Sequence, residues 1–149
     1  MMQEHVKNSV QNFFHETLSV RCENYEKFPV LKVYCARITL SFEKERYHYT
    51  LSMRDETLQM ISQVLLYEDN PDEDIKIDLI CECANLIIGS AKVAIEEANG
   101  GILLQLSPPE YQGYFEGEFS KDFDEKLYFK VKDSFFRIGI EKEEITIEA

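Results

Sequence analysis

The chain has 149 residues, and 28 aspartates and glutamates outnumber 16 lysines and arginines, which gives a formal net charge of −12. That length suits one domain with a real core, and a hydrophobic share of 44% argues against a disordered acidic tail. An acidic surface repels phosphate backbones and anionic lipids, so the composition disfavours nucleic-acid and membrane partners. We therefore expect a single domain over residues 1–149 with a protein or small-molecule partner.

Cysteine usage and the first residues bear on the compartment. No CxxC pair is present, and Cys81 and Cys83 point in divergent directions because they lie two residues apart in a helical stretch. We interpret them, with Cys22 and Cys35, as ordinary buried thiols rather than a metal or redox site. The opening MMQEHVKNSV lacks the apolar core of a signal peptide, and no run approaches the ~20 apolar residues of a membrane span. These features indicate a cytoplasmic protein.

The first half of the sequence predicts a helix, a hairpin and a second helix. Between residues 5 and 20, apolar residues recur at helical spacing on one face: Val6, Val10, Phe13, Phe14 and Leu18. Residues 30–51 are rich in β-branched and aromatic side chains, and the charged turn Glu43–Arg46 divides them into a predicted hairpin. Ser52–Asp55 has the form of a capping box, and Leu58, Ile61 and Leu65 continue at helical spacing.

The longest predicted element is a helix that ends at about residue 98. Asn70 can cap it, Pro71 suits its first position, and the acidic residues that follow favour the positive end of the helix dipole. The run EDNPDED could also suggest a calcium loop, but it lacks the central Gly and the distal bidentate Glu of such loops. Asn99–Gly101 supplies residues that tolerate positive φ and end the helix.

The remaining residues predict strands. The short apolar run Gly101–Leu106 is stopped by Ser107-Pro108-Pro109, and further strands are expected near residues 112–120, 125–132, 134–141 and 144–148. The apolar residues Phe136, Ile138 and Ile140 alternate with Arg137, Gly139 and Glu141, as in a half-buried strand. Helices with runs of strands predict the α+β class, with a largely antiparallel sheet packed against long helices.

One narrow stripe of the long helix is polar. Six residues recur on it at spacings of four and three: Asp78, Glu82, Asn85, Gly89, Lys92 and Glu96. Apolar residues occupy most of the remaining circumference: Leu79, Ile80, Cys83, Ala84, Leu86, Ile87, Ile88, Ala91 and Ile95. Such a helix is buried on most sides and exposes one seam. In mid-helix Gly89 costs about 1 kcal/mol relative to Ala, and a position without a side chain would let another molecule approach closely.

Glu82 and Asn85 are the candidate chemical pair on this seam. They lie one turn apart and combine a charged acceptor with a group that both donates and accepts, so they could hold a cationic side chain and a water molecule together. A polar seam is also what any mostly buried helix needs, and the string E-x-x-N is short enough to arise by chance. A second copy, Glu96–Asn99, abuts two glycines and is better explained as a helix terminator.

The longer string around this pair resembles a known family. DLICECANLIIGSAK (residues 78–92) is similar to the signature helix of the CheX-type chemotaxis phosphatases, within the CheC/CheX/FliY family, which reads approximately D-x-x-G-E-x-x-N-φ-φ-x-G-N-A-K with φ apolar. The segment LSPP (residues 106–109), followed by Gly113, resembles the strand end and loop after that helix. A single convincing E-x-x-N matches the CheX branch, whereas many CheC proteins carry two. The order of elements fits nearly the whole chain, so the resemblance implies a CheC-like fold.

Three departures from the family pattern mark a divergent member. Cys81 stands where the family commonly has Gly, and Ser90 stands where it commonly has Asn. The charged turn Glu43–Arg46 replaces a small, Gly-containing hairpin turn. These changes affect the detailed fit to a partner, but Glu82 and Asn85 are retained.

The resemblance implies a phosphatase that removes the aspartyl phosphate of a CheY-like response regulator and so terminates the chemotaxis signal. Glu82 would pair with the regulator's active-site Lys, and Asn85 would orient the hydrolytic water in line with the phosphorus. Asp78, Gly89 and Lys92 would contact the partner. Because Asn does not titrate and an aspartyl phosphate is already labile, positioning the water is the main task left to the helper protein.

The resemblance also bears on cofactors and partners. The Mg²⁺ ion would be supplied by the response-regulator partner, and we expect no cofactor or metal in this chain. A homodimer is implied, with exposed strand edges as its contact. Two rival functions remain: a non-catalytic binding module that docks a response regulator or flagellar-switch protein, and a phosphatase of the same fold that acts on a receiver outside chemotaxis. Motifs of other enzyme classes, such as G-x-S-x-G or H-E-x-x-H, do not occur.

Overall fold

The computed structural model describes residues 2–118 and 121–145. Within them, the helices are α1 (Met2–Asn12), α2 (Asp55–Leu65) and α3 (Glu73–Ala98), and α1 continues into a wide π turn, η1 (Phe13–Thr17). The strands are β1 (Cys22–Tyr25), β2 (Val33–Phe42), β3 (Glu45–Arg54), β4 (Gln105–Leu106), β5 (Glu110–Phe115), β6 (Glu125–Val131) and β7 (Ser134–Glu144).

All these strands belong to one antiparallel sheet, in the order β1-β6-β7-β3-β2-β4. Both β4 and β5 pair with the side of β2 that β3 leaves open, β4 with residues 40–41 and β5 with residues 33–37. Pro108 and Pro109 separate β4 from β5, because a proline has no N–H to donate to the ladder. The predicted α+β class with a largely antiparallel sheet is confirmed.

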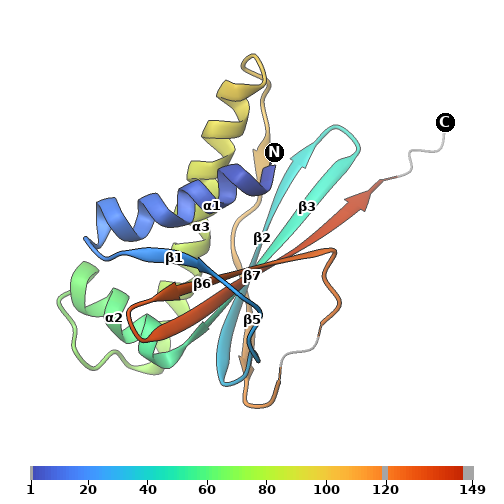
Figure 1. Cartoon of the computed structure of the whole chain (residues 1–149). Coiled ribbons are helices and arrows are strands. Elements are labelled where there is room, and N and C mark those ends of the chain that lie inside the picture. The colour runs from blue at the N-terminus through green and yellow to red at the C-terminus, as the bar shows by residue number, and fades with distance from the viewer. Residues whose placement is uncertain (1, 119–120, 146–149) are drawn as a thin grey trace.

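The hydrophobic core lies between one face of this sheet and the helices α1 and α3 (Figure 1). The apolar face predicted for the first helix is buried there: Val6, Val10, Phe13, Phe14 and Leu18. The sheet contributes alternate residues of its central strands: Ile38, Leu40, Leu51, Met53, Phe136 and Ile138. This packing holds α3 against the sheet.

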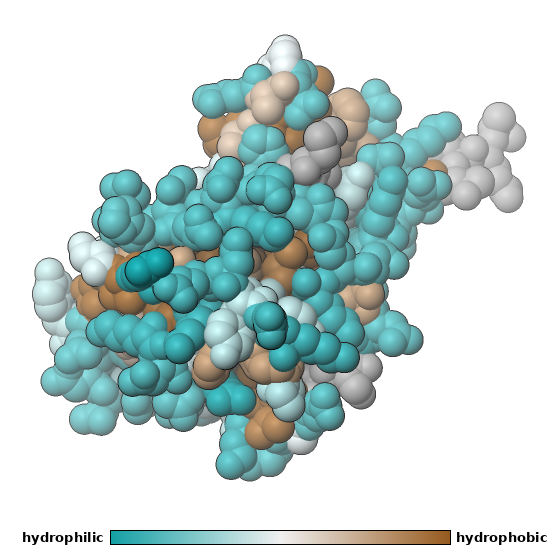
Figure 2. All heavy atoms as spheres, in the orientation of Figure 1, coloured by the Kyte–Doolittle hydropathy of each residue, from teal (hydrophilic) through white to brown (hydrophobic). Residues whose placement is uncertain are grey.

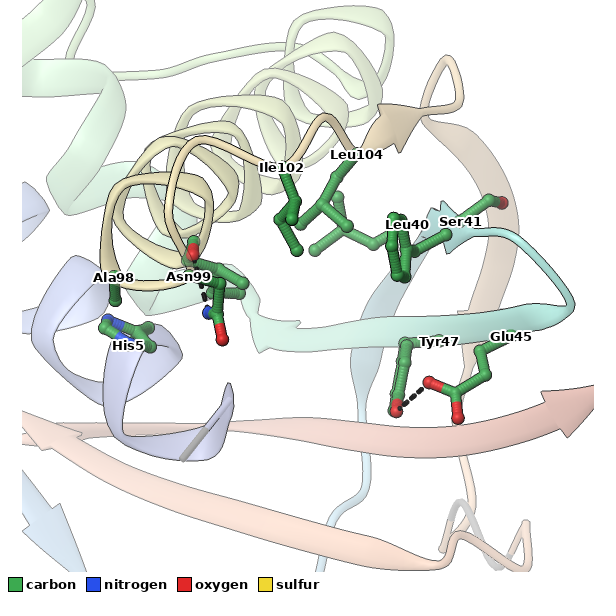
Figure 3. A pocket seen from close by; sticks show the side chains of 11 residues that line it. His5, Leu40, Ser41, Glu45, Tyr47, Ala98, Asn99, Ile102 and Leu104 are labelled. Carbon is green, nitrogen blue, oxygen red and sulfur yellow. Dashed lines mark hydrogen bonds between the residues drawn. The ribbon is translucent and has the colours of Figure 1, made fainter.

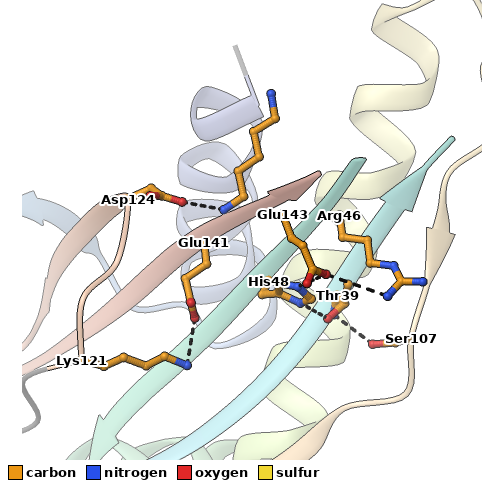
Figure 4. A network of polar contacts seen from close by, with 9 residues as sticks. Thr39, Arg46, His48, Ser107, Lys121, Asp124, Glu141 and Glu143 are labelled. Carbon is orange, nitrogen blue, oxygen red and sulfur yellow. Dashed lines mark hydrogen bonds and ion pairs between the residues drawn. The ribbon is translucent and has the colours of Figure 1, made fainter. Parts of the chain in front are cut away.

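The opposite face of the sheet carries polar side chains at the end where the β2–β3 turn lies (Figure 4). The hydroxyl of Thr39 lies 2.8 Å from Nδ1 of His48, and Nε2 of His48 lies 3.2 Å from a carboxylate oxygen of Glu143. The hydroxyl oxygen of Ser107 accepts a hydrogen bond of 2.9 Å from the Thr39 N–H and so ties the loop after β4 to β2. This network links β2, β3, β7 and the loop after β4 on the face of the sheet opposite the helices.

Further along the same face, β7 departs from the prediction of a half-buried strand. Arg137 and Gly139 are buried as well as the apolar residues with which they alternate. The reason is Phe123, which lies over this part of the sheet with its ring centre 5.0 Å from the Arg137 guanidinium. The ring lies so close to Gly139 that an added Cβ would come within 2.6 Å of it. The half-buried prediction is therefore wrong at these two positions.

Two predicted helix starts are also wrong. The strand β3 continues through Arg54 opposite Val33, so Ser52 is a buried strand residue beside Cys35 (Oγ to Sγ, 3.2 Å) and not a helix cap. The long helix is capped by Asp72, whose carboxylate accepts a 2.9 Å hydrogen bond from the Ile75 N–H, and not by Asn70. The register of the β2–β3 pair sets the start of α2, and the path of the preceding loop sets the start of α3. A local sequence motif contains neither kind of information.

The predicted strands are present with shifted boundaries. The run Gly101–Leu106 pairs only as β4, because Gly100 and Gly101 have positive φ (73° and 81°) and form the turn after α3. The strand expected near residues 112–120 begins earlier, at Glu110, and residues 119–120 lie outside the described residues. Of the strand expected at 144–148, only Glu144 lies in β7, which pairs with β3 up to that residue; residues 146–149 lie outside the described part. The short strand β1 was not predicted.

The four cysteines carry free thiols, and three of them are buried as predicted. Burial raises the pKa of Cys35 to about 11, so that this thiol stays neutral. Cys81 is the exception, because it is only partly buried.

Candidate functional site

Helix α3 is fixed at both ends by contacts to other elements. At its start, the Tyr34 hydroxyl donates a 2.8 Å hydrogen bond to the Glu73 carboxylate, and Lys76 forms an ion pair of 2.6 Å with Asp55 of α2. At its end, the Leu104 N–H of the following loop donates a 2.8 Å hydrogen bond to the Glu96 carboxylate. One side of the helix is buried along its length: Leu79, Ile80, Cys83, Ala84, Ile87, Ile88, Ala91 and Ile95. The helix is therefore a rigid platform.

Glu82 and Asn85 stand in the middle of this platform and are both exposed. Residues one turn apart on a helix have Cβ atoms about 5–6 Å apart, so the two side chains are neighbours. Neither side chain forms a hydrogen bond or ion pair with any other described residue, whereas Glu73, Lys76 and Glu96 nearer the helix ends are all engaged. The carboxylate and the carboxamide are thus free to bind a molecule from outside.

The second E-x-x-N copy has the structural role that the sequence predicts. Asn99 follows the last helical residue, and its side-chain amide donates a 2.7 Å hydrogen bond to the Ile95 carbonyl. The Glu96 carboxylate accepts a 2.8 Å hydrogen bond from the Leu104 N–H and pairs with Lys92 at 3.0 Å. The Leu104 N–H and then Lys92 lower the pKa of Glu96. This pair ties the loop after α3 to the helix and is not free for a ligand.

The other three predicted contact residues lie around Glu82 and Asn85 in different settings. Asp78 is exposed one turn before Glu82. Gly89 is partly buried, and an added Cβ would lie 3.7 Å from Leu106 of β4, an ordinary contact distance. Lys92 is 25% exposed and is held by Glu96. The stripe therefore opens to solvent at Asp78, Glu82 and Asn85 and turns toward β4 further along.

The structure exposes two apolar residues on α3 that the sequence reasoning missed. The prediction that Leu86 belongs to the buried circumference is wrong, because Leu86 is 42% exposed; Val93 is 50% exposed. At 3.6 residues per turn, Val93 follows the buried Ala84 by about two and a half turns, which puts it on the opposite side of the helix. The same angular arithmetic places Leu86 beside it. The angular position of a residue around the helix axis indicates this exposure from the sequence, whereas the residue type does not.

The segment after α3 returns alongside the helix and borders this face (Figure 1). Leu106 lies against Gly89, and further along Tyr111 of β5 lies near the start of α3. Burial, and then the charge of Glu73, raise the pKa of Tyr111. In the sequence, Pro108 and Pro109 lie between Leu106 and Tyr111.

Cys81 adjoins Glu82, and its surroundings favour the neutral thiol. Burial raises the pKa of the Cys81 thiol, and the negative charge of Asp78 raises it further. The neutral thiol therefore supplies a small, weakly polar surface next to the carboxylate.

A separate apolar pocket of about 420 Å³ lies where α3 ends, between α1, the β2–β3 hairpin and the loop after α3 (Figure 3). Leu40, Ile95 and Leu104 form its walls, and neither Glu82 nor Asn85 lines it. Its carboxylate, Glu45, is already held by the Tyr47 hydroxyl at 2.9 Å and by Lys142 at 3.4 Å. On the face of the molecule seen in Figure 2, hydrophobic residues gather at this end and elsewhere in a few patches. The unengaged side chains of Glu82 and Asn85 therefore lie on the exposed face of α3 and not in this pocket.

The structure is thus an antiparallel α+β domain in which a helix held at both ends presents an exposed carboxylate and an exposed carboxamide one turn apart. A family model described as "Chemotaxis phosphatase CheX" matches residues 34–113, more than half of the chain. The chain therefore belongs to the CheX family. No match was found among curated proteins.

Solved structures agree on the fold. The chemotaxis protein CheX from Vibrio vulnificus is 17% identical, with a TM-score of 0.80 over 96% of this chain and 97% of the other. A CheC-like superfamily protein from Shewanella sp. PV-4 is 16% identical, with a TM-score of 0.75 over 95% and 97%. A chain in the CheX–CheY–BeF3–Mg complex from Borrelia burgdorferi is 16% identical, with a TM-score of 0.68 over 97% and 99%. These likenesses confirm the CheC-like fold.

Proposed function

We propose that this protein hydrolyses the aspartyl phosphate of a CheY-like response regulator and so ends a chemotaxis signal. The observation that carries the proposal is the pair Glu82 and Asn85, exposed and unengaged side by side on a helix that is fixed at both ends. Membership of the chemotaxis phosphatase family and the likeness to a chain crystallised with CheY support this choice of substrate.

Glu82 serves to dock the regulator. A carboxylate that has no partner within its own chain and sits on an acidic face favours a cationic side chain, and the active-site Lys of a receiver carries that charge. A charge-assisted hydrogen bond between the two fixes the register of the helix over the phosphorylated pocket. Asp78, one turn before Glu82, adds to the negative potential that attracts the same region of the partner.

Asn85 positions the water. Its side-chain amide reaches the phosphoryl group once Glu82 is paired, and it holds a water molecule opposite the aspartyl oxygen. The water oxygen then forms a bond to phosphorus as the phosphorus–aspartyl oxygen bond breaks, which yields phosphate and a free aspartate. A carboxamide does not titrate in this range, so it orients the water without removing its proton.

The Mg²⁺ ion in this scheme belongs to the regulator. Among residues 2–118 and 121–145, no three His, Cys, Asp or Glu side chains are grouped as metal ligands. The exposed acids of α3 are better suited to a cationic side chain, and the ion that neutralises the phosphoryl oxygens would enter with the partner.

The test compares phosphate release from phosphorylated CheY-like receivers with the native protein and with Asn85→Ala. We expect the variant to lose roughly 10²-fold in acceleration, the order that misplacing a reacting group costs, while its affinity for the receiver changes little. Glu82→Ala should instead weaken the complex in a binding titration. The second E-x-x-N copy offers a matched control, because Asn99→Ala removes the same side chain from the same helix and should leave phosphate release unchanged. Full acceleration by Asn85→Ala would refute the role of this residue.

The same assay separates the rival functions. Receiver binding without acceleration by the native protein would favour a binding module for a response regulator or flagellar-switch protein. Acceleration confined to receivers outside chemotaxis would favour the second rival.

Two further features complete the proposal. The homodimer would use the strands at the two sheet edges, β1 on one side and β4 with β5 on the other, and sedimentation equilibrium tests it. No helix in the described part of the chain has the length and hydropathy to cross a bilayer. We place the protein in the cytoplasm, where its substrate would be found.

A further inference from the structure

The open face of α3 is apolar as well as polar. Leu86 directly follows Asn85, and Val93 lies two turns after Leu86 on the same side of the helix. The residues between them on this face are small, Gly89 and Ser90. This stretch has two exposed branched side chains with only small residues between them, and it begins next to the carboxamide of Asn85; we call it the Leu86–Val93 depression.

The fold itself gives no reason for the small residue in this depression. A Cβ on Gly89 would meet only Leu106 at 3.7 Å, so an alanine would fit. Glycine nevertheless costs about 1 kcal/mol in a helix interior. Single exposed apolar residues are common on protein surfaces, but here two of them flank a glycine that the packing does not require. The arrangement suits the close approach of another surface.

The position of Asn85 determines which molecule covers this depression. A partner that pairs with Glu82 and brings a phosphoryl group to Asn85 necessarily covers Leu86, the next residue. Val93 lies eight residues after Asn85, about 12 Å along the helix axis. A standard protein interface buries about 800 Å² on each partner, a patch about 28 Å across. Val93 therefore falls within the footprint of the same partner.

We propose that Leu86 and Val93 are the anchors that seat the receiver domain on α3 and select which receivers are accepted. This inference rests on the proposed function and adds the chemistry of the partner surface: an apolar patch beside the phosphorylation pocket, facing the C-terminal half of α3. Neither side chain has a polar group for the reaction. Their contribution is the same before and during phosphoryl transfer, so it sets binding and not the rate of the bound complex.

The experiment measures Leu86→Ala and Val93→Ala against two matched controls, Leu66→Ala and Val64→Ala at the end of α2. Leu66 is 51% exposed and Val64 is 37% exposed, so each pair removes the same side chain from a comparably open position. Three quantities are determined: the affinity for a CheY-like receiver activated with beryllofluoride, and the kcat and KM of phosphate release from the phosphorylated receiver. We expect Leu86→Ala to raise Kd and KM roughly tenfold, as truncation of a buried interface residue does, with kcat unchanged. Val93→Ala should act in the same direction, and the α2 variants should match the native protein.

The outcomes distinguish this inference from the proposed function. If the native protein accelerates phosphate release and both α3 variants bind the receiver as tightly as the controls, the anchor assignment is overturned and the phosphatase stands. If kcat falls while KM is unchanged, these residues act in the chemistry and the anchor assignment is again wrong. If the native protein neither binds nor dephosphorylates any receiver tested, the proposed function fails, and the anchors fail with it.

Discussion

Replacing Gly89 by alanine should stabilise the protein and weaken its complex with a receiver. Gly89 lies in the interior of α3, where alanine is favoured by about 1 kcal/mol. The added Cβ would lie 3.7 Å from Leu106, an ordinary contact, so no clash reduces the gain. For a chain of this length, 1 kcal/mol corresponds to a rise in Tm of roughly 3 °C. The new methyl group would stand at the edge of the depression between Leu86 and Val93 and keep a docked surface further from the helix.

The assay combines urea unfolding followed by far-UV circular dichroism with titration of a beryllofluoride-activated receiver. Gly100→Ala is a suitable contrast, because Gly100 has a φ of 73° and alanine there should destabilise by roughly 1 kcal/mol. A lower free energy of unfolding for Gly89→Ala would show that α3 and β4 approach more closely than their contact indicates. The expected stabilisation with unchanged receiver affinity would refute the close-approach role of Gly89.

Three further predictions test the framework of the site. Asp72→Ala removes the cap of α3 and should lower the free energy of unfolding by about 1 kcal/mol in urea; no change would mean that the cap contributes nothing. The Leu104 N–H is the main cause of the lowered pKa of Glu96. The stabilisation of the fold by the ionised Glu96 carboxylate is therefore present above the ordinary glutamate pKa and is lost as the pH falls through the lowered pKa. Glu96→Gln should therefore flatten the dependence of Tm on pH between about pH 5 and 3, and an unchanged slope would contradict this. Gly139→Ala forces the Phe123 ring to move and should cost about 1–3 kcal/mol, a loss that should largely disappear when Phe123→Ala is already present.

The elements that the sequence predicted best are those whose signals are local and periodic. The apolar face of α1, the β2–β3 hairpin and the buried side of α3 all follow from spacings of 3.6 or two residues. The glycines after Ala98 mark the end of α3 because their positive φ is a property of the residue type itself. These features needed no knowledge of what lies across the core.

The predictions that failed depend on distant contacts. Arg137 and Gly139 are buried only because Phe123, from another segment, lies over them. Ser52 reads as a helix cap until the hairpin register places it opposite Cys35. The strand β1 has four residues, of which only Cys22 is buried, and it exists because β6 offers an open edge. No periodic pattern could have indicated it.

The candidate site also has features that the local spacing predicts and one feature that was predicted wrongly. The exposure of Glu82 and Asn85 was predictable, because polar residues at three- and four-residue spacing share one side of a helix. Leu86 was assigned to the core because it is apolar, although its angle from Ala84 places it on the open side. On this helix the angular position decides exposure, and residue type does not.

A helper protein that catalyses by orienting a water needs accurate placement more than reactive groups, because the benefit of positioning falls steeply with small errors. Helix α3 meets this requirement through an uneven distribution of contacts. Glu73 and Lys76 bind neighbouring elements at its start, and Glu96 binds the following loop near its end. Glu82 and Asn85 in the middle are free. The helix backbone is held on both sides of Glu82 and Asn85, so their remaining conformational freedom is mainly that of their side chains. In the proposed complex, pairing of Glu82 with the partner would remove much of this freedom. In the proposed mechanism, the polar contacts at the helix ends are therefore needed for accurate placement as much as the pair that would meet the substrate.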